Sequence, residues 1–343
     1  MKSRNQNLLI IYTGGTIGMV EDPDDKSLKP LDFNHISDEI PELKKIKHSI
    51  TWKSLDQVVD SSYINPENWI QMAQMVFDYY KEYDGFIILH GTDTMTYSAS
   101  ALSFLLENLQ KPVVFTGSQL PIGLIRTDGR ENLISAIEVA SSMNAFGPMV
   151  PGVTICFENK LFRGNRTTKF SAEDFNAFIS PNYPVLAELG VHLKFNTEAI
   201  NYPEHKKTLR IYNQFDPNIA ILKVFPGISS DFIKNFFTNF KLRAVIIETY
   251  GSGNAPTETW FIDILYNYIN HGGIILNVTQ CMAGRVEQGK YETSLALQNA
   301  GVIGGSDITT EAAVTKLMFL LGKGLDRENI IFWLNNSISG EIS

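Results

Sequence analysis

The feature of this sequence that most constrains its fold is a repeated alternation of short apolar runs with amphipathic helical segments. The run at 8–12 is continuous and aliphatic and ends at a glycine-rich turn, as expected for a buried parallel strand that enters a loop. Three similar runs follow, at 86–89, 113–116 and 153–157. The helical pattern at 66–82 has Asn65 as its cap and Pro66 at its first position. Alternation of this kind predicts a mostly parallel sheet with helices on both faces.

A second series of the same kind occupies the C-terminal part of the chain. Its predicted strands lie at 219–224, 244–248 and 274–278. Its predicted helices lie at 230–240, 257–270, 308–321 and 327–336. Between the two series the hydrophobic periodicity fades and polar residues dominate. The sequence therefore predicts an α/β protein: a larger, doubly wound N-terminal domain over 1–190, a linker over 191–217 and a smaller C-terminal α/β domain over 218–343.

Composition and charge narrow the class of partner. The 343 residues are 44% hydrophobic and 19% charged, values typical of globular proteins. The net charge of −8 offers no basic surface for nucleic acid or for an anionic membrane, and no apolar run approaches the roughly 18 residues needed to span a bilayer. We therefore expect a small-molecule partner, no nucleic acid and no membrane.

Cysteine and histidine usage argues against disulfides and metals. Cys156 and Cys281 are the only cysteines, they lie far apart, and no CxxC motif is present. None of the six histidines belongs to an HExxH motif, so we expect no metal. The polar N-terminus and an apolar run too short for a signal peptide favour a cytoplasmic protein.

Polar and glycine-rich segments follow the predicted strands, where open α/β sheets bind their ligands. The segments are 13–18, 90–94, 116–119 and 163–169. Glycines let the backbone approach a ligand and turn N–H groups toward an oxyanion, and a threonine hydroxyl becomes a nucleophile when a base such as a buried lysine lies beside it. Asp93 can orient such a lysine or bind a substrate ammonium. Taken alone, each threonine reads as a turn former or helix cap and Lys169 as a solvated surface residue.

The order of these motifs resembles a known family. Thr13-Gly-Gly-Thr16-Ile-Gly18, Asp60-Ser61-Ser62, His90-Gly-Thr92-Asp93-Thr94 and Arg163-Gly-Asn-Arg-Thr-Thr168-Lys169 resemble the bacterial-type L-asparaginases, and the cytosolic type I branch in particular. The segment 249–256, Thr-Tyr-Gly-Ser-Gly-Asn-Ala-Pro, extends the resemblance into the second domain. The resemblance implies a hydrolase that converts L-asparagine and water into L-aspartate and ammonia without a cofactor.

The resemblance also implies roles for individual residues. Thr16 matches the nucleophile, and Thr92, Asp93 and Lys169 match a second catalytic group; either threonine can be the first to attack. Asp60 and Ser61 match the substrate-binding loop, in which Ser61 would hold the α-carboxylate, while Asp93 would pair with the α-ammonium and Thr92 would also contact substrate. Ser118 matches a backbone contact to the side-chain amide. The Asp-Ser-Ser form of the loop is similar to that of the cytosolic branch.

Two departures from the family pattern concern a lid and an effector site. Many members carry a lid tyrosine about a dozen residues after the nucleophile, whereas 19–30 contains none and Leu28 holds the nearest position; the segment 21–29 still reads as a mobile loop. The family's effector pocket for a second asparagine is matched by Thr168, Asn254, Thr279 and Cys281. Glu248 replaces an arginine of the allosteric bacterial enzymes, and it would repel an effector carboxylate.

Alternatives remain open at the level of the sequence. The resemblance implies a homodimer or a dimer of dimers, and one methylene discriminates glutamine from asparagine only weakly, so a weak glutaminase side activity is expected. One alternative is the ammonia-releasing subunit of a tRNA-dependent amidotransferase, which needs a further N-terminal domain. The other is a non-enzymatic ligand-binding module of doubly wound type, although no GxGxxG or P-loop motif is present.

Overall fold

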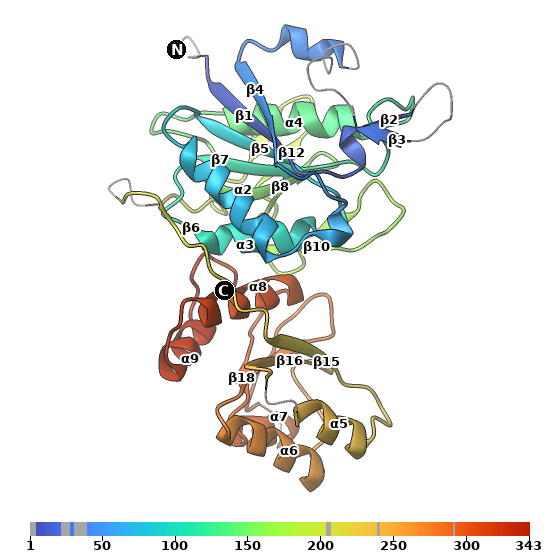
Figure 1. The fold of residues 1–343 in the computed structure, drawn as a ribbon, viewed down its shortest axis with the longest axis vertical. Helices are drawn as coiled ribbons and strands as arrows, with labels where there is room; N and C mark the ends of the chain where they lie inside the picture. Colours follow the sequence, from blue (N-terminus) through green and yellow to red (C-terminus); the bar gives the residue numbers. More distant parts are fainter. Residues whose placement is uncertain (1–4, 22–27, 31–39, 204–206, 239–240, 291) are drawn as a thin grey trace. The chain divides into compact units, whose positions relative to one another are not determined.

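The computed structural model describes residues 5–21, 28–30, 40–203, 207–238, 241–290 and 292–343. The chain divides into two compact units, residues 1–213 and 214–343 (Figure 1). The predicted fold class is confirmed, because each unit is built on a sheet with a parallel core and helices on both faces. The range 191–217, predicted as a linker, contains two short strands, β13 (Leu193–Phe195) and β14 (Arg210–Ile211).

The first unit is organised around an eight-stranded sheet in the order β13-β12-β9-β8-β7-β5-β1-β4. Its parallel strands are β1 (Asn7–Tyr12), β4 (Ser49–Ser54), β5 (Gly85–Leu89), β7 (Pro112–Thr116) and β8 (Gly152–Phe157). Three antiparallel strands complete it, β9 (Lys160–Arg163), β12 (Ala187–Leu189) and β13. Strands β5 and β7 are buried along their whole length, because helices cover both faces.

Helices α2 (Pro66–Asp78) and α3 (Met95–Leu105) lie on one face of this sheet and α4 (Gly129–Ser141) on the other (Figure 1). Helix α2 begins where the sequence predicted. Asn65 and Asn68 form a capping box, with Pro66 at the first position. The helix ends at Asp78, four residues before the predicted end at 82.

Several short elements of the first unit were not predicted. They are β2 (Met19–Glu21), β3 (Leu28–Pro30), β6 (Leu106–Glu107), β10 (Thr168–Lys169), β11 (Phe178–Ile179) and the 3-10 turns η1 (Thr16–Gly18), η3 (Pro41–Lys45), η4 (Ser61–Tyr63) and η5 (Gly164–Arg166). Three antiparallel ribbons use them: β2 with β3, β10 with β11, and β14 with β6. The ribbon of β10 and β11 carries Lys169.

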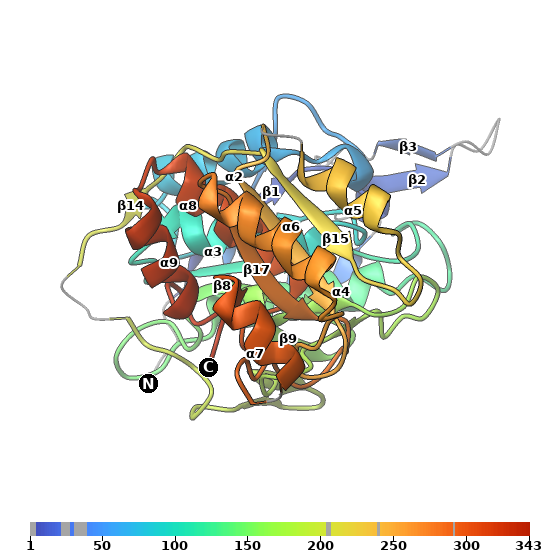
Figure 2. The same cartoon turned by 90° about the horizontal axis from the view of Figure 1, so that it is seen from below.

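The second unit has a four-stranded parallel sheet in the order β15 (Ile219–Lys223), β16 (Ala244–Thr249), β17 (Ile274–Thr279) and β18 (Ile303–Gly304). Helices α5 (Ser230–Phe237), α6 (Thr259–Asn270) and α7 (Glu292–Asn299) cover one face, and α8 (Thr310–Gly322) covers the other (Figures 1 and 2). Helix α9 (Arg327–Asn335) packs against α8. Strand β18 and helix α7 were not predicted.

Candidate active site

Three loops meet at the carboxyl ends of the parallel strands of the first unit. A Cβ atom on Gly15 would lie 2.4 Å from the Cα of Gly91, and one on Gly91 would lie 2.5 Å from the Oγ of Ser61. Thr94 joins two of these loops, because its hydroxyl donates to the carbonyl oxygen of Ser61 at 2.7 Å. The two glycines are therefore required by close backbone packing. The predicted loops 13–18, 60–62 and 90–94 form one cluster.

Thr16 begins the 3-10 turn η1 directly after Gly15, whose φ of +89° suits glycine. The side chain of Thr16 is half-buried, and its hydroxyl makes no hydrogen bond with any residue that the structure describes. Because the backbones of Gly15 and Gly91 touch, Thr16 and Thr92 start from neighbouring positions. The turn thus presents a hydroxyl group that is not committed elsewhere.

Tyr12, the last residue of β1, packs against this turn. Its ring occupies the space that a side chain at position 18 would need, and its hydroxyl lies 3.4 Å from the carbonyl oxygens of Gly15 and Gly18. Burial raises the pKa of Tyr12 to about 12, so the phenol stays protonated. Tyr12 was not among the predicted site residues, although an aromatic residue immediately before the first glycine-rich loop was a visible signal.

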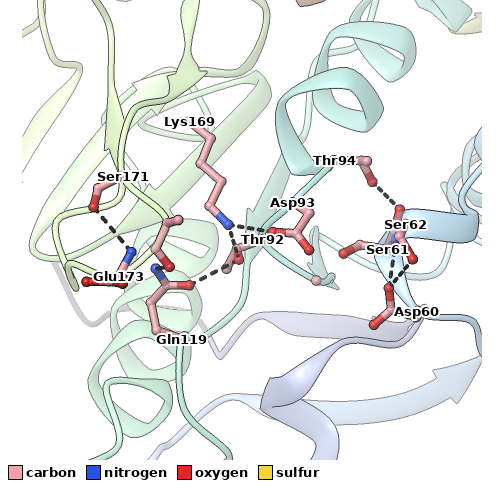
Figure 3. A network of polar contacts seen from close by, with 12 residues as sticks. Asp60, Ser61, Ser62, Thr92, Asp93, Thr94, Gln119, Lys169, Ser171 and Glu173 are labelled. Carbon is pink, nitrogen blue, oxygen red and sulfur yellow. Dashed lines mark hydrogen bonds and ion pairs between the residues drawn. The ribbon is translucent and has the colours of Figure 1, made fainter.

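Lys169 joins the predicted second catalytic group (Figure 3). Its Nζ donates to Thr92 Oγ1 at 2.9 Å and to Asp93 Oδ1 at 2.6 Å. The side chain of Lys169 is 16% exposed and that of Asp93 is 65% exposed. Lys169, 77 residues from Thr92 in the sequence, therefore completes a contiguous hydroxyl, ammonium and carboxylate cluster, open to solvent on the aspartate side.

His90 holds the Thr92 loop from inside the protein. Its Nδ1–H donates to the carbonyl oxygen of Gly91 at 2.7 Å, since a carbonyl can only accept, and its Nε2 therefore accepts from Ser98 Oγ at 2.8 Å. Ser98 in turn accepts from the indole N–H of Trp69 at 3.0 Å. Burial lowers the pKa of His90 to about 4, so the ring is neutral. The ring thus braces the Thr92 loop through its hydrogen bonds to Gly91 and Ser98.

The two predicted residues of the substrate loop, Asp60 and Ser61, differ in burial. Ser61 is buried against Gly91, whereas Asp60 is exposed. The carboxylate of Asp60 accepts from the hydroxyl and the N–H of Ser62, at 2.6 and 2.8 Å (Figure 3). Those hydrogen bonds hold the pKa of Asp60 below its ordinary value.

Ser118 and Gln119 follow strand β7. The Ser118 hydroxyl donates its proton to the carbonyl oxygen of Leu120 at 2.6 Å, so it has no proton left to donate to a ligand. Gln119 was not among the predicted site residues, yet its Oε1 accepts from Thr92 Oγ1 at 3.1 Å (Figure 3). No local signal in the sequence pointed to this contact beyond the place of Gln119 in a strand-end loop.

The candidate effector residues fall in two units. Thr168 lies in β10 of the first unit. In the second unit, Thr279 donates to the carbonyl oxygen of Gly251 and accepts from the N–H of Cys281, and Asn254 accepts from Thr293. The effector pocket stays a prediction.

Glu248, which was predicted to weaken the effector pocket, has partners inside its own unit. It accepts from the Thr310 hydroxyl at 2.9 Å and lies 3.8 Å from Lys223 Nζ. The carboxylate therefore already has a donor and a cation within β15, β16 and the start of α8.

The predicted mobile loop at 21–29 lies largely outside the described residues, which omit 22–27. Across the described ranges, no group of three or more histidine, cysteine or acidic side chains could hold a metal ion. No helix among those residues is long and apolar enough to cross a membrane.

Comparisons with known proteins find a match for each of the two units. Residues 7–201 match the family model described as Asparaginase, N-terminal, and residues 218–333 match the Glutaminase/Asparaginase C-terminal domain. The chain is 41% identical over 345 residues to L-asparaginase 1 of Escherichia coli strain K12, with 99% of each chain covered. It is 31% identical to a Glutamyl-tRNA(Gln) amidotransferase subunit of Archaeoglobus fulgidus, over 97% of this chain and 78% of that protein.

A solved structure extends the likeness to three dimensions. The crystal structure of L-asparaginase I from Vibrio cholerae superposes with a TM-score of 0.89 at 36% identity. The match covers 99% of this chain and 100% of that one.

Proposed function

The chain belongs to the asparaginase family, and on that premise we propose that it is an amidohydrolase converting L-asparagine and water into L-aspartate and ammonia. The observation that carries the proposal is the contact of Lys169 with both Thr92 and Asp93, at 2.9 and 2.6 Å. A base, a hydroxyl and a carboxylate stand together at the strand ends, beside a second threonine hydroxyl.

Thr16 is the first nucleophile in this proposal. Thr92 Oγ1 is engaged on two sides, since it accepts from Lys169 and donates to Gln119, whereas the Thr16 hydroxyl has no partner among the described residues. The Lys169 ammonium, which donates to Thr92 and Asp93, first gives up a proton to solvent. Thr16 Oγ then attacks the carboxamide carbon, and its proton passes to the lysine amine, directly or through Thr92. Proton transfer by positioned groups contributes roughly 10² to 10⁴ in rate.

The rest of the cycle uses the same groups. Backbone N–H groups of the packed glycine loops stabilise the developing oxyanion. Ammonia leaves with the proton that the lysine returns, and an aspartyl ester on Thr16 remains. Water, activated by Thr92 and Lys169, attacks the ester and releases L-aspartate. No cofactor takes part in these steps.

Substrate recognition relies on charge. Asp93 uses Oδ1 for Lys169, and Oδ2 makes no hydrogen bond with the described part of the chain, so it is available for the α-ammonium of the substrate. We assign the α-carboxylate to Ser61 and the loop of Asp60, and the carboxamide to the backbone at Ser118. Glutamine is one methylene longer, which a pocket rejects by only about 1 to 3 kcal/mol, so weak glutaminase activity accompanies the main reaction.

We further propose a cytoplasmic homo-oligomer, either a homodimer or a dimer of dimers. The location is supported by the Asp-Ser-Ser form of the substrate loop and by two unpaired cysteines, Cys156 and Cys281.

The test is to incubate the purified protein with L-asparagine or L-glutamine and to follow ammonia and the amino acid product by NMR. The proposal predicts equimolar L-aspartate and ammonia, and slower release from glutamine. Absence of ammonia from both substrates, with folded protein shown by circular dichroism, contradicts it. Protection by nucleotides in a thermal-shift assay would then favour the ligand-binding module.

The likeness to an amidotransferase subunit supports a second candidate, ammonia release for a tRNA-dependent amidotransferase. That function predicts that ammonia release depends on glutamyl-tRNA and a partner protein. Full activity of the isolated chain on free asparagine rules it out.

A further inference from the structure

The backbone of Gln119 is fixed by a buried carboxylate. Its N–H donates to both oxygens of Asp128, at 3.1 and 3.0 Å, and the N–H of Leu120 donates to the same group at 3.2 Å. Asp128 also accepts from Asn132 Nδ2 at 3.1 Å, and that amide donates to the carbonyl oxygen of Gly117. Because the carboxylate and the asparagine are both buried, the start of the Gln119 side chain has a defined position.

The orientation of the Gln119 amide follows from its partners. Its Nε2 faces two carbonyl oxygens, those of Asp174 at 3.1 Å and Ala172 at 3.4 Å, and carbonyls can only accept. The amide oxygen therefore faces Thr92, and the Thr92 hydroxyl must be the donor in that 3.1 Å contact. Lys169 can only donate to the same hydroxyl, so the direction of the Thr92 proton is determined by its neighbours.

The contacts of Gln119, Thr92 and Lys169 form a closed ring of hydrogen bonds and chain segments. The segment that receives the Gln119 amide has its own turn, in which the Ser171 hydroxyl accepts from the N–H groups of Glu173 and Asp174 (Figure 3). That turn starts two residues after Lys169, so Gln119 connects Thr92 to the segment carrying the lysine, and the lysine returns to Thr92. The distance between the hydroxyl and the ammonium is thus fixed from both sides.

We propose that Gln119 is a positioning residue that acts through Thr92, holding its hydroxyl between the Gln119 amide oxygen and the Lys169 ammonium. The proposal deepens the proposed function and rests on it. A threonine hydroxyl has one proton and two lone pairs. The Gln119 amide oxygen accepts the hydrogen bond from that proton and the Lys169 ammonium donates to one lone pair, which leaves the second lone pair to accept a hydrogen bond from Thr16 or from water.

The experiment compares three variants. Gln119→Leu removes both ends of the amide at nearly constant size, and Gln119→Glu keeps an acceptor for Thr92 but loses the donor to Ala172 and Asp174. Gln110→Leu is the matched control, because Gln110 also donates through its side chain to a backbone carbonyl, that of Lys207 at 2.7 Å. Each variant is assayed for kcat and KM with L-asparagine, and the crystal structures of the wild type and of both Gln119 variants are determined.

The proposal predicts that Gln119→Leu lowers kcat roughly 10- to 100-fold, as expected for a displaced reacting group, with KM changed less than about threefold. Gln119→Glu should keep kcat within about fivefold of the wild type, and Gln110→Leu should match the wild type, because neither change removes the acceptor for Thr92. In the crystals, Thr92 should leave its position beside Lys169 only in Gln119→Leu.

Equal losses of kcat in Gln119→Leu and Gln119→Glu would overturn the proposal, because anchoring of the 171–174 turn would then be the whole effect. An unmoved Thr92 in the Gln119→Leu crystal would overturn it as well. If the wild type releases no ammonia, the proposed function fails, and the Thr92 position in the crystals still decides the role of Gln119.

Discussion

Each unit of the molecule contains a close lysine–carboxylate pair, and the two pairs are built differently. Lys169 and Asp93 lie 2.6 Å apart at the strand ends of the first unit, with side chains 16% and 65% exposed. Lys316 and Glu341 lie 2.5 Å apart in the second unit, and both side chains are fully buried. These two examples of the same chemical pair thus lie in different surroundings, one at a solvent-accessible site and one in the interior.

The partners of the buried pair explain the difference. Glu341 accepts from the N–H groups of Ile338 and Ser339, and Lys316 also donates to the carbonyl oxygen of Asn336. Burial alone would raise the pKa of Glu341, but the Lys316 ammonium and those N–H groups hold it below its ordinary value. Both members of the buried pair have further hydrogen-bond partners inside the protein, and the pair joins helix α8 to the C-terminal segment. Its role is therefore structural.

The exposed pair, Lys169 and Asp93, has side-chain partners whose hydrogen bonds can change during a reaction. Within the described ranges, the Lys169 ammonium donates to a hydroxyl and to one oxygen of an exposed carboxylate, and to no backbone carbonyl. An exposed pair contributes at most about 1 kcal/mol to stability. The comparison teaches that solvent access and partner type, and not the presence of an ion pair, distinguish a lysine proposed to be catalytic from a structural one.

The largest effect is expected for Lys169→Met. We predict that kcat/KM for L-asparagine falls about 10³- to 10⁴-fold, because the positioned base is lost, while the free energy of unfolding changes by less than about 1 kcal/mol. Steady-state ammonia release and urea titration measure the two quantities. A variant that keeps a tenth of the wild-type activity would remove Lys169 from the mechanism.

Lys316→Met should show the opposite pattern. The substitution leaves Glu341 buried without its counter-charge, so we predict a loss of roughly 3 to 5 kcal/mol in the free energy of unfolding. The kcat of the folded fraction should stay at the wild-type value. The double variant Lys316→Met/Glu341→Leu serves as the control and should regain most of the stability, because no unpaired charge remains. Unchanged stability of the single variant would refute the structural role.

A smaller effect is expected from His90, which holds the Thr92 loop. Its pKa is about 4 in the folded protein and about 6.5 when unfolded, so the unfolded chain binds more protons between these values. The stability contribution is fully present above pH 6.5 and is lost as the pH falls toward 4. Between pH 7.5 and pH 5 the wild type should lose about 2 kcal/mol that His90→Gln does not lose. Urea titrations at both values test this; parallel losses in the two proteins would contradict it.

The smallest effect concerns a third pair, Lys223 and Glu248, at 3.8 Å with the lysine side chain 66% exposed. Lys223→Ala should change the free energy of unfolding by less than about 0.5 kcal/mol.

Glu248 also leads to a prediction about cooperativity. Because Glu248 would repel an effector carboxylate, the plot of reaction rate against asparagine concentration should give a Hill coefficient near one. A coefficient clearly above one would show that the effector pocket operates despite Glu248.

The parallel cores of both units could be predicted because fully buried strands are continuous apolar runs. Strand β4 was missed because its sequence, Ser49-Ile-Thr-Trp-Lys-Ser54, mixes polar and apolar residues at an edge that is only half-buried. The antiparallel strands β9, β12 and β13 were missed because they have only three or four residues each. Hydrophobic periodicity carries little information over so short a stretch.

The motifs of the candidate site could be located from the sequence, but their supporting contacts could not. Thr92 and Lys169 are 77 residues apart, and only the fold brings them together. Neither Tyr12 nor Gln119 was predicted. The place of Tyr12 before the first glycine-rich loop was visible in the sequence, but its packing against Gly18 and the contact of Gln119 with Thr92 depend on the fold.

The most direct test of the central claim, that Thr16 attacks the amide while Lys169 and Thr92 move the proton, is acid quenching during turnover of L-asparagine, followed by peptide mass spectrometry. The account predicts an added aspartyl group on the peptide containing Thr16, and neither adduct nor turnover in Thr16→Ala. An adduct on Thr92, or wild-type turnover by Thr16→Ala, would contradict it.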